Sequence, residues 1–355
     1  MNVLFYLAPQ THIPTNEVYE HAAVCIAEGF KNSGVTFYAN TFQWYDNEIN
    51  DYLFKPSPSD FNPDVCIYST SYFAFNLGSV NDLNNTKYNI LLDLDDGYPT
   101  ISNSVGFKKF NLVLRTHYSL DYTYNNNVHP WAFGVSNRIT TEIDKTLNEP
   151  ESNDVYVNYR VGFNTRSMSI NEMLPVLAKK YNINHSVTDN IDIKELEHLN
   201  VNDYWNQTGR RHNPDYYKQL NKSLLTFTFC GAFEQKEPKF LYRLKETIEK
   251  RTARLSKNFT VANFDSWRFW ESLYSNSCPV HLDFFFWNLR FPVQPIEGKH
   301  FIGVRNMNFK ETAERINNMN ETEIRQIARE GRKFASENYS PIPTAKRLIN
   351  MINKY

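Results

Sequence analysis

The hydrophobic positions of this chain fall into two repeating patterns, which predict alternating strands and helices. Continuous apolar runs of four to eight residues are typical of strands that are buried on both faces of a parallel sheet. Residues 17–33 instead have apolar side chains at three- and four-residue spacing, as in an amphipathic helix, and Gly34 ends this pattern. The strand–helix–strand order predicts right-handed parallel crossovers. Strands are expected at residues 3–8, 35–39, 64–69, 88–94 and 112–116.

The same patterns return after residue 153 and predict a second unit of the same kind. Residues 42–63 read as irregular, residues 136–153 as a polar linker, and residues 240–255 as the helical core of a charged insertion. We therefore expect an α/β protein with two Rossmann-like, doubly wound domains that face each other across a cleft. The strands expected in the second unit are residues 154–163, 183–187, 224–230, 278–282 and 301–304. The helices expected there are residues 169–181, 215–222, 267–276, 308–319, 321–337 and 345–352.

The amino-acid composition limits which binding partners and which cellular location we expect for this protein. The length of 355 residues suits two domains, and a net charge of -1 gives no indication of nucleic-acid binding. The four cysteines lie in apolar or helical runs without a C-x-x-C pair, which favours buried free thiols in a reducing compartment. No apolar stretch reaches 18 residues, and residues 1–14 read as a first strand rather than a signal peptide. We therefore expect a cytoplasmic protein, with peripheral membrane contact left open.

Two common nucleotide-binding motifs are absent from the sequence. The loop after the first expected strand lacks G-x-G-x-x-G, which disfavours a nicotinamide enzyme. The P-loop pattern G-x-x-x-x-G-K-[ST] does not occur, which disfavours a P-loop kinase or nucleotide hydrolase.

Residues 263–280 combine features that suit an anionic nucleotide. Asp265 or Ser266 can cap a helix that follows directly, and the N-terminus of a helix attracts phosphate. Arg268 in the first turn supplies a fixed cation, and Glu271, one turn later, can accept hydrogen bonds from a ribose or sugar hydroxyl. The alternative interpretation is an amphipathic helix that packs on a strand, with Arg268 and Glu271 as a surface ion pair.

Two blocks in the second unit carry a resemblance to a known family. Residues 268–280, RFWESLYSNSCPV, are similar to a block written R-x-x-E-A-(x)-G-C-(I/V)-P-V. Residues 216–231, YYKQLNKSLLTFTFCG, are similar to the stretch Y-x-x-L-x-x-S-K-F-x-L-x-x-x-G that precedes it. Both blocks resemble GT-B glycosyltransferases, especially the exostosin-like and family-1-like groups. The sequence resemblance covers residues 155–335. The N-terminal half resembles the family only in the order of its predicted strands and helices. The E-x7-E motif of retaining members is absent, because its second glutamate would fall at Pro279.

The resemblance implies a domain organisation, a reaction and a set of donor-binding residues. It implies an acceptor-binding domain over residues 1–140, a nucleotide-sugar-binding domain over residues 151–335, and a C-terminal helix over residues 336–355 that crosses back. The reaction would move a hexosyl or pentosyl group from a nucleotide sugar to a glycan or lipid-linked acceptor, with no cofactor and no divalent metal. The donor-binding residues would be Arg166, Arg211, Gly231, Ser266, Arg268 and Glu271.

Acidic residues follow the expected strand 88–94, at a position where ligands bind in such sheets. In a GT-B enzyme, Asp95 or Asp96 would be the base or bind the acceptor, and His12 and His117 are further candidates. The same DLDDG segment also suits the metal-binding D-x-D of a GT-A-type glycosyltransferase, the nucleophile motif of a haloacid dehalogenase, or a polar turn. The GT-A alternative leaves the two blocks above unexplained, and the Gly-Tyr-Pro that ends the segment suits a dehalogenase poorly. A non-catalytic carbohydrate-binding protein is a further alternative.

Overall fold

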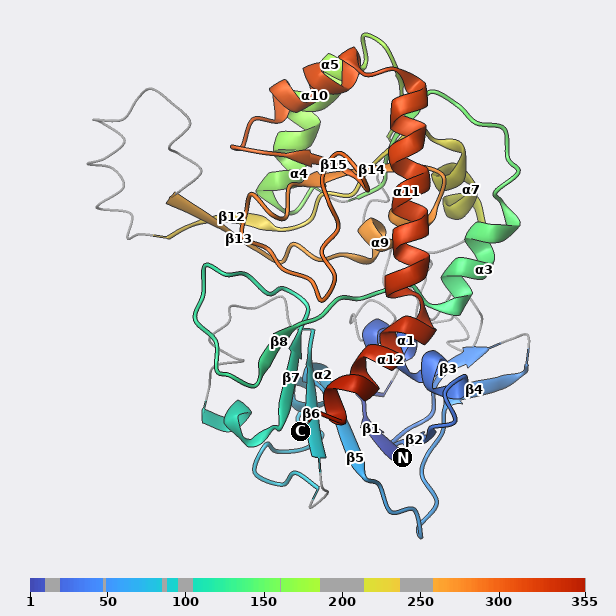
Figure 1. The fold of residues 1–355 in the computed structure, drawn as a ribbon, viewed down its shortest axis with the longest axis vertical. Coiled ribbons are helices and arrows are strands. Elements are labelled where there is room, and N and C mark those ends of the chain that lie inside the picture. The colour runs from blue at the N-terminus through green and yellow to red at the C-terminus, as the bar shows by residue number, and fades with distance from the viewer. Residues whose placement is uncertain are drawn as a thin grey trace, which may run out of the picture.

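The computed structural model describes residues 1–9, 20–46, 49–84, 88–94, 105–159, 161–185, 214–236 and 258–354. Within these ranges the chain forms two larger sheets, which Figure 1 shows one above the other. Each strand predicted from a continuous apolar run has a counterpart in one of the two sheets, with ends that differ by a few residues.

The first sheet lies in the lower part of Figure 1 and is parallel throughout. Among the described residues its strands are, in spatial order, β2 (Thr36–Ala39), β1 (Asn2–Tyr6), β5 (Val65–Ser69), β6 (Tyr88–Asp93), β7 (Leu112–Arg115) and β8 (Val128–Pro130). Helix α1 (His21–Lys31) connects β1 to β2 on one side, whereas β5 pairs with β1 on the other side. The strand order therefore reverses between β1 and β5, which makes this position a topological switch point.

The second sheet is also parallel and repeats this arrangement in the upper part of Figure 1. Its strands in the described part of the chain are, in spatial order, β10 (Asn182–His185), β9 (Asp154–Val157), β11 (Leu225–Phe227), β14 (Cys278–Leu282) and β15 (Ile302–Val304). Because helices cover both faces, the largely apolar strands β9, β11, β14 and β15 are buried on both sides, whereas the polar edge strand β10 is partly exposed.

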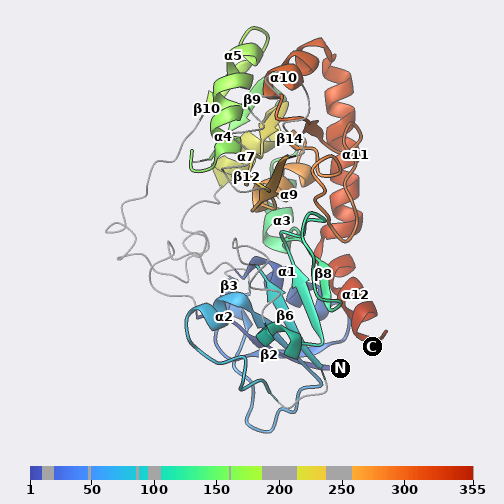
Figure 2. The same ribbon diagram turned by 90° about the vertical axis from the view of Figure 1, so that its left-hand side faces the viewer.

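Helices cover the second sheet from both sides. Figure 2 shows α4 (Asn164–Met168) and α5 (Leu174–Leu177) on one side of it and α11 (Glu321–Tyr339) on the other. A π-helical turn, η3 (Ser169–Met173), joins α4 to α5. The remaining helices of this unit are α7 (Pro214–Lys222), α9 (Trp267–Tyr274) and α10 (Phe309–Asn318). An Asn320–Glu323 capping box starts α11, which contacts both α9 and β14. This arrangement confirms the predicted α/β fold with two Rossmann-like units.

The last helix, α12 (Pro341–Ile352), lies against the first unit rather than the second. It packs along α1, and Ala345 and Leu348 belong to the apolar core of the first sheet. Gly29 makes this close approach possible, because a Cβ atom there would lie 2.1 Å from the carbonyl oxygen of Pro341. The chain thus ends on the unit with which it began. The residue limits of the three predicted domains stay a prediction.

Several elements were not predicted from the sequence. The stretch read as irregular contains an antiparallel pair, β3 (Gln43–Asp46) and β4 (Asp51–Phe54). The stretch read as a polar linker contains α3 (Asn137–Lys145), which buries Ile139 and Ile143 one turn apart. A short helix, α2 (Thr70–Ala74), and a 3-10 turn, η2 (Val105–Lys109), flank β6, and a second antiparallel pair is formed by β12 (Ala232–Gln235) and β13 (Phe259–Ala262). The helical core expected at residues 240–255 lies outside the described residues.

The structure confirms the predicted burial of the cysteines. The cysteines Cys25, Cys66, Cys230 and Cys278 are all buried and free, as their positions in apolar runs predicted. In the described parts of the chain, no helix is both long enough and apolar enough to cross a membrane.

Candidate functional site

The N-terminus of α9 lies against the first unit. Ser266 caps the helix as predicted, because its hydroxyl oxygen accepts a hydrogen bond from the backbone N–H of Phe269 at 3.4 Å. The next residue, Trp267, stacks on His21 at the start of α1, with ring centroids 4.9 Å apart. The helix start that the sequence singled out therefore meets the carboxyl-end side of the first sheet.

Asp265 joins the two units at the same place. Its backbone N–H donates to Nδ1 of His117, just after β7, at 3.1 Å. Its carboxylate accepts a hydrogen bond from Nε1 of Trp270 at 2.6 Å and another from the backbone N–H of Phe133 at 3.1 Å. Burial raises the pKa of Asp265 to about 7, against the opposing effect of His117. The sequence identified Asp265 only as a cap, and nothing local to it indicates these distant partners.

His117 helps to join the two units, and the catalytic role considered for it from the sequence stays a prediction. Its ring is buried and makes edge contacts with Phe133 and Phe264. Because Nδ1 already accepts the N–H of Asp265, this nitrogen is engaged in joining the units.

Two arginines predicted to bind phosphate come together over one aromatic ring. The guanidinium carbons of Arg166, on α4, and Arg268, on α9, lie 5.4 and 5.8 Å from the ring centroid of Tyr159. Burial, with a further contribution from the charge of Arg268, lowers the pKa of Arg166. Nε of Arg268 is buried and has no hydrogen-bond partner in the described parts of the chain. Two neighbouring cations, one with an unused donor, favour an anion between or beside them.

The loops after β9 and β11 hold Arg166 in place. Its Nε donates to the carbonyl oxygen of Phe229 at 2.9 Å, and its neighbour Thr165 donates to the carbonyl oxygen of Gly231 at 2.6 Å. Gly231 has a φ of +93°, and a Cβ atom there would lie 2.5 Å from the carbonyl oxygen of Ala262. Only glycine fits this backbone next to β13. Gly231 thus shapes the carboxyl-end edge of the second sheet from which Arg166 extends.

Glu271, on the same helix as Arg268, is buried and contacts α7. Its two carboxylate oxygens accept hydrogen bonds from the hydroxyls of Tyr216 at 2.7 Å and Tyr217 at 3.4 Å. Burial raises its pKa, while the tyrosine hydrogen bonds and the charges of His21 and Arg268 oppose this shift. With 1% of its surface exposed, Glu271 cannot form a surface ion pair with Arg268, so this part of the alternative interpretation is wrong, although α9 does pack on β14 as that interpretation predicted. The ribose-binding role of Glu271 stays a prediction.

The remaining predicted site residues lie outside the described residues. These are the catalytic candidates His12, Asp95 and Asp96, and the donor-binding candidate Arg211. Their neighbour Asp93 is described, and its carboxylate forms a buried ion pair with Arg115 of β7 at 2.6 Å. Both the D-x-D metal site and the dehalogenase nucleophile would need Asp93 as their first aspartate. An aspartate with no exposed surface that is paired with a buried arginine is poorly placed for either role, which argues against both alternatives.

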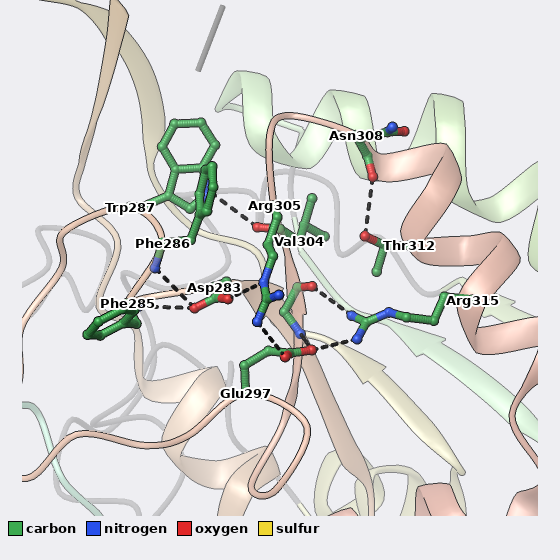
Figure 3. Close-up of polar contacts among 11 residues, drawn as sticks. Asp283, Phe285, Phe286, Trp287, Glu297, Val304, Arg305, Asn308, Thr312 and Arg315 are labelled. Atoms are coloured by element: carbon green, nitrogen blue, oxygen red, sulfur yellow. Dashed lines mark hydrogen bonds and ion pairs between the residues drawn. The ribbon is translucent and has the colours of Figure 1, made fainter. Parts of the chain in front are cut away.

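A polar cluster anchors a second connection between the units. Figure 3 shows Asp283 and Arg305, which follow β14 and β15, with Glu297 and Arg315. Arg305 donates to Asp283 at 2.6 Å and to Glu297 at 2.9 Å, and Arg315 donates to Glu297 at 2.7 Å. The other oxygen of Asp283 accepts two backbone N–H groups of the following turn, from Phe285 and Phe286.

The turn held by Asp283 reaches the first unit. The carbonyl oxygen of Asn288 accepts the N–H of Leu120 at 2.8 Å, and the N–H of Arg290 donates to Tyr118 at 2.9 Å. The side chain of Asn288 donates to Asp121 at 2.9 Å. The strand-end loops of the two sheets are therefore joined by backbone hydrogen bonds beside the site.

Replacing Asp283 by alanine is expected to weaken this connection. The substitution removes one partner of Arg305 and two backbone hydrogen bonds, so the free energy of unfolding should fall by about 1–3 kcal/mol. Urea unfolding measures the change. The matched control is Lys310→Ala, which removes an exposed ion pair with Glu314 and should change stability by less than about 0.5 kcal/mol. Equal stability of the two variants would contradict the anchoring role.

Clustered metal ligands are not found in the described residues. No group of three or more histidine, cysteine, aspartate or glutamate side chains there is arranged to hold a metal ion.

Comparisons with known proteins give matches by structure only. No family model matches the sequence, and a search of curated proteins finds no significant match. Similar solved structures include an alpha-glucosyltransferase in complex with UDP and a 13-mer DNA containing a central A:G mismatch, with 9% identity, a TM-score of 0.58 and 99% coverage of both chains. Another is a glycosyltransferase involved in avilamycin A biosynthesis, with 8% identity, a TM-score of 0.55, and coverage of 98% of this chain and 96% of that one.

A third similar structure is HepE of Anabaena in complex with UDP-glucose, with 10% identity, a TM-score of 0.52 and full coverage of both chains. All three similarities span both units and their connection. They show that the chain has the fold of these glycosyltransferases, which confirms the predicted GT-B fold class. The exostosin-like and family-1-like features stay a prediction.

Proposed function

We propose that this protein is a glycosyltransferase that binds a nucleotide sugar at the start of α9 and transfers its sugar to a glycan or a lipid-linked acceptor. The observation that carries the proposal is the pair Arg166 and Arg268 over Tyr159, with a buried Nε of Arg268 that has no partner among the described residues. A leaving nucleoside diphosphate develops negative charge as its bond to the sugar breaks. Two preorganised guanidinium groups and a capped helix N-terminus stabilise that charge.

The donor is proposed to carry uridine diphosphate. This choice rests on the similar structures, two of which contain UDP or UDP-glucose. Glu271 would bind the ribose, and Gly231 would let the backbone approach the donor. We further propose that no divalent metal is needed, because guanidinium groups at the site supply positive charge. A nucleic-acid acceptor is not proposed, since the net charge of -1 offers no basic excess. Buried free thiols suit a reducing compartment such as the cytoplasm.

A thermal-shift experiment tests the proposal. UDP and UDP-glucose should raise the melting temperature, GDP and CMP less so, and EDTA should leave the shift unchanged. Arg268→Ala should weaken UDP binding roughly 10- to 100-fold, since a charge-assisted hydrogen bond contributes about 1.5–3 kcal/mol. Arg329→Ala is the matched control, because Arg329 is exposed on α11 and, in the described part of the chain, bonds only to Gln326 of its own helix.

The outcomes separate the competing ideas. UDP binding that is lost in Arg268→Ala but kept in Arg329→Ala supports the proposed donor site. A shift that requires Mg²⁺ or Mn²⁺ would contradict the metal-independent part of the proposal alone. Wild-type protein that binds no nucleotide would overturn the proposed function.

A further inference from the structure

We propose that Glu20 is a catalytic residue of this transferase, whose free carboxylate oxygen Oε2 accepts the proton of the attacking acceptor hydroxyl. The inference rests on the proposed function and adds a residue from the first unit to it. No sequence pattern indicated Glu20, which precedes α1 and lies at its N-cap position.

The first observation is the position of Glu20 at the switch point of the first sheet. Its oxygen Oε1 accepts hydrogen bonds from the N–H of Ala8, which follows β1, at 3.3 Å and from the hydroxyl of Ser69, which ends β5, at 2.7 Å. The hydroxyl of Ser71 on α2 donates to the same oxygen. Ligands of open α/β sheets bind outside the carboxyl ends of the strands at this reversal. The strand order reverses between β1 and β5, and the hydrogen bonds of Glu20 join the segment after β1 to the end of β5.

The second observation is the unequal use of the two carboxylate oxygens. Three donors converge on Oε1, whereas Oε2 is buried and has no hydrogen-bond partner in the described parts of the chain. Only 3% of the residue is exposed. A buried carboxylate oxygen without a partner costs free energy, so a purely structural glutamate would be expected to satisfy both oxygens. The clamp on Oε1 fixes the carboxylate, so Oε2 is the oxygen that we assign to the substrate hydroxyl.

The third observation is that Glu20 adjoins the contact that joins the two units. His21, the next residue, stacks on Trp267, which directly precedes Arg268. The proposed acceptor-side residue and the proposed donor-side residue are therefore each one position away from the same ring stack. A transferase needs this proximity, because acceptor and donor must meet at the anomeric carbon.

The chemistry of the step is balanced without a cofactor. The acceptor oxygen forms a bond to the anomeric carbon while the bond from that carbon to the phosphate oxygen breaks. The electron pair of the broken bond leaves with the nucleoside diphosphate, next to Arg166 and Arg268. The proton of the acceptor hydroxyl moves to Oε2 of Glu20. Burial raises the pKa of Glu20, against the hydrogen bonds from Ser71, Ser69 and Ala8, which makes its carboxylate a stronger base than an exposed glutamate.

The experiment uses Glu20→Gln in the full-length chain. Glutamine keeps the shape and the amide oxygen that the three donors need, but it cannot accept the proton. We expect UDP to bind as tightly as in the wild type, while UDP release from UDP-glucose, with water or octyl β-glucoside as acceptor, falls at least about 100-fold. The wild-type rate should fall at low pH as Glu20 becomes protonated. The residual activity of Glu20→Gln should lack this fall, a change that a structural role of Glu20 would not produce.

The matched control is Glu28→Gln on the same helix. Glu28 is also buried, but its Oε2 accepts the N–H of Asn137 at 2.7 Å, so this variant should keep wild-type transfer. If Glu20→Gln binds UDP and releases it from UDP-glucose at the wild-type rate, the inference fails while the proposed function stands. The inference also fails if the wild type binds UDP but releases none from UDP-glucose with either acceptor. Failure of the wild type to bind UDP instead counts against the proposed function.

Discussion

Gly29→Ala should destabilise this protein by about 3 kcal/mol, although alanine is normally the better helix former. In an exposed helix the change stabilises by up to about 1 kcal/mol. Here the new Cβ atom would lie 2.1 Å from the carbonyl oxygen of Pro341 and 2.5 Å from Cβ of Ala345, so α12 must move away from α1. Overpacking of this kind costs about 1–3 kcal/mol, and partial exposure of Ala345 and Leu348 adds to it.

Two measurements separate this mechanism from a general loss of stability. Urea unfolding gives the change in free energy, and hydrogen exchange shows whether α12 loses protection before the rest of the chain. The matched control is Gly162→Ala, because a Cβ atom there would meet nothing within 4 Å. We expect that control to lie within about 0.5 kcal/mol of the wild type. Wild-type stability and wild-type protection of α12 in Gly29→Ala would show that the two helices do not depend on this close contact.

The pattern of apolar runs predicted both parallel sheets because their strands are buried on two faces. Cys278–Leu282, for example, is apolar at four of its five positions and forms β14 in the middle of the second sheet. Such strands need no knowledge of their partners to be recognised. The antiparallel pair β12 and β13 was missed for the opposite reason. Ala232–Gln235 and Phe259–Ala262 are adjacent in the sheet but far apart in the sequence, so neither predicts the other.

Prediction of helices failed where burial depends on distant elements. α3 contains only two buried apolar positions, Ile139 and Ile143, among polar residues, so its sequence resembles a linker. Its polar Glu142 and Arg138 are also buried, because Trp44 and the backbone of Tyr45 contact Arg138 from another part of the chain. No local pattern contains this information.

The candidate site shows the same division between local and distant information. The cap at Ser266 and the cation at Arg268 follow from one short stretch of sequence, and the structure places both at the start of α9. The approach of Arg166 to Arg268 depends on how α4 and α9 meet, although the two residues are 102 positions apart in the sequence. Glu20 emerges only from the strand order of the first sheet, because one partner, Ala8, follows β1 and another, Ser69, ends β5. Sequence motifs therefore indicated the proposed donor side, whereas topology is needed to find the residue proposed for the acceptor side.

Asp265→Asn should be strongly destabilising and should also change how stability depends on pH. The two carboxylate oxygens accept hydrogen bonds from Trp270 and from the backbone of Phe133, and an asparagine has only one oxygen to offer. Its amide NH₂ would face an N–H donor, which leaves both groups buried without a partner. We expect the free energy of unfolding to fall by about 3 kcal/mol at acidic pH, where Asp265 contributes most to the stability of the wild type.

The sign of the pH effect follows from the raised pKa. Burial raises the pKa of Asp265 from 3.8 to about 7, so between these values the folded state holds a proton that the unfolded state has released. The stability that this group contributes is therefore present at low pH and is lost as pH rises to about 7. The wild type should lose up to about 2 kcal/mol more than Asp265→Asn between pH 5.5 and pH 8, because one pH unit corresponds to about 1.4 kcal/mol.

Urea unfolding at the two pH values measures this difference directly. Glu28, whose pKa burial also raises to about 7, is present in both proteins, so its effect cancels in the comparison. The control is Asp144→Asn, whose carboxylate is about half exposed and pairs with Arg332, and which should change stability by less than about 1 kcal/mol at either pH. If the wild type and Asp265→Asn show the same change between pH 5.5 and pH 8, Asp265 does not titrate in this range. Its carboxylate would then join α9 to the first unit in the same charged state throughout.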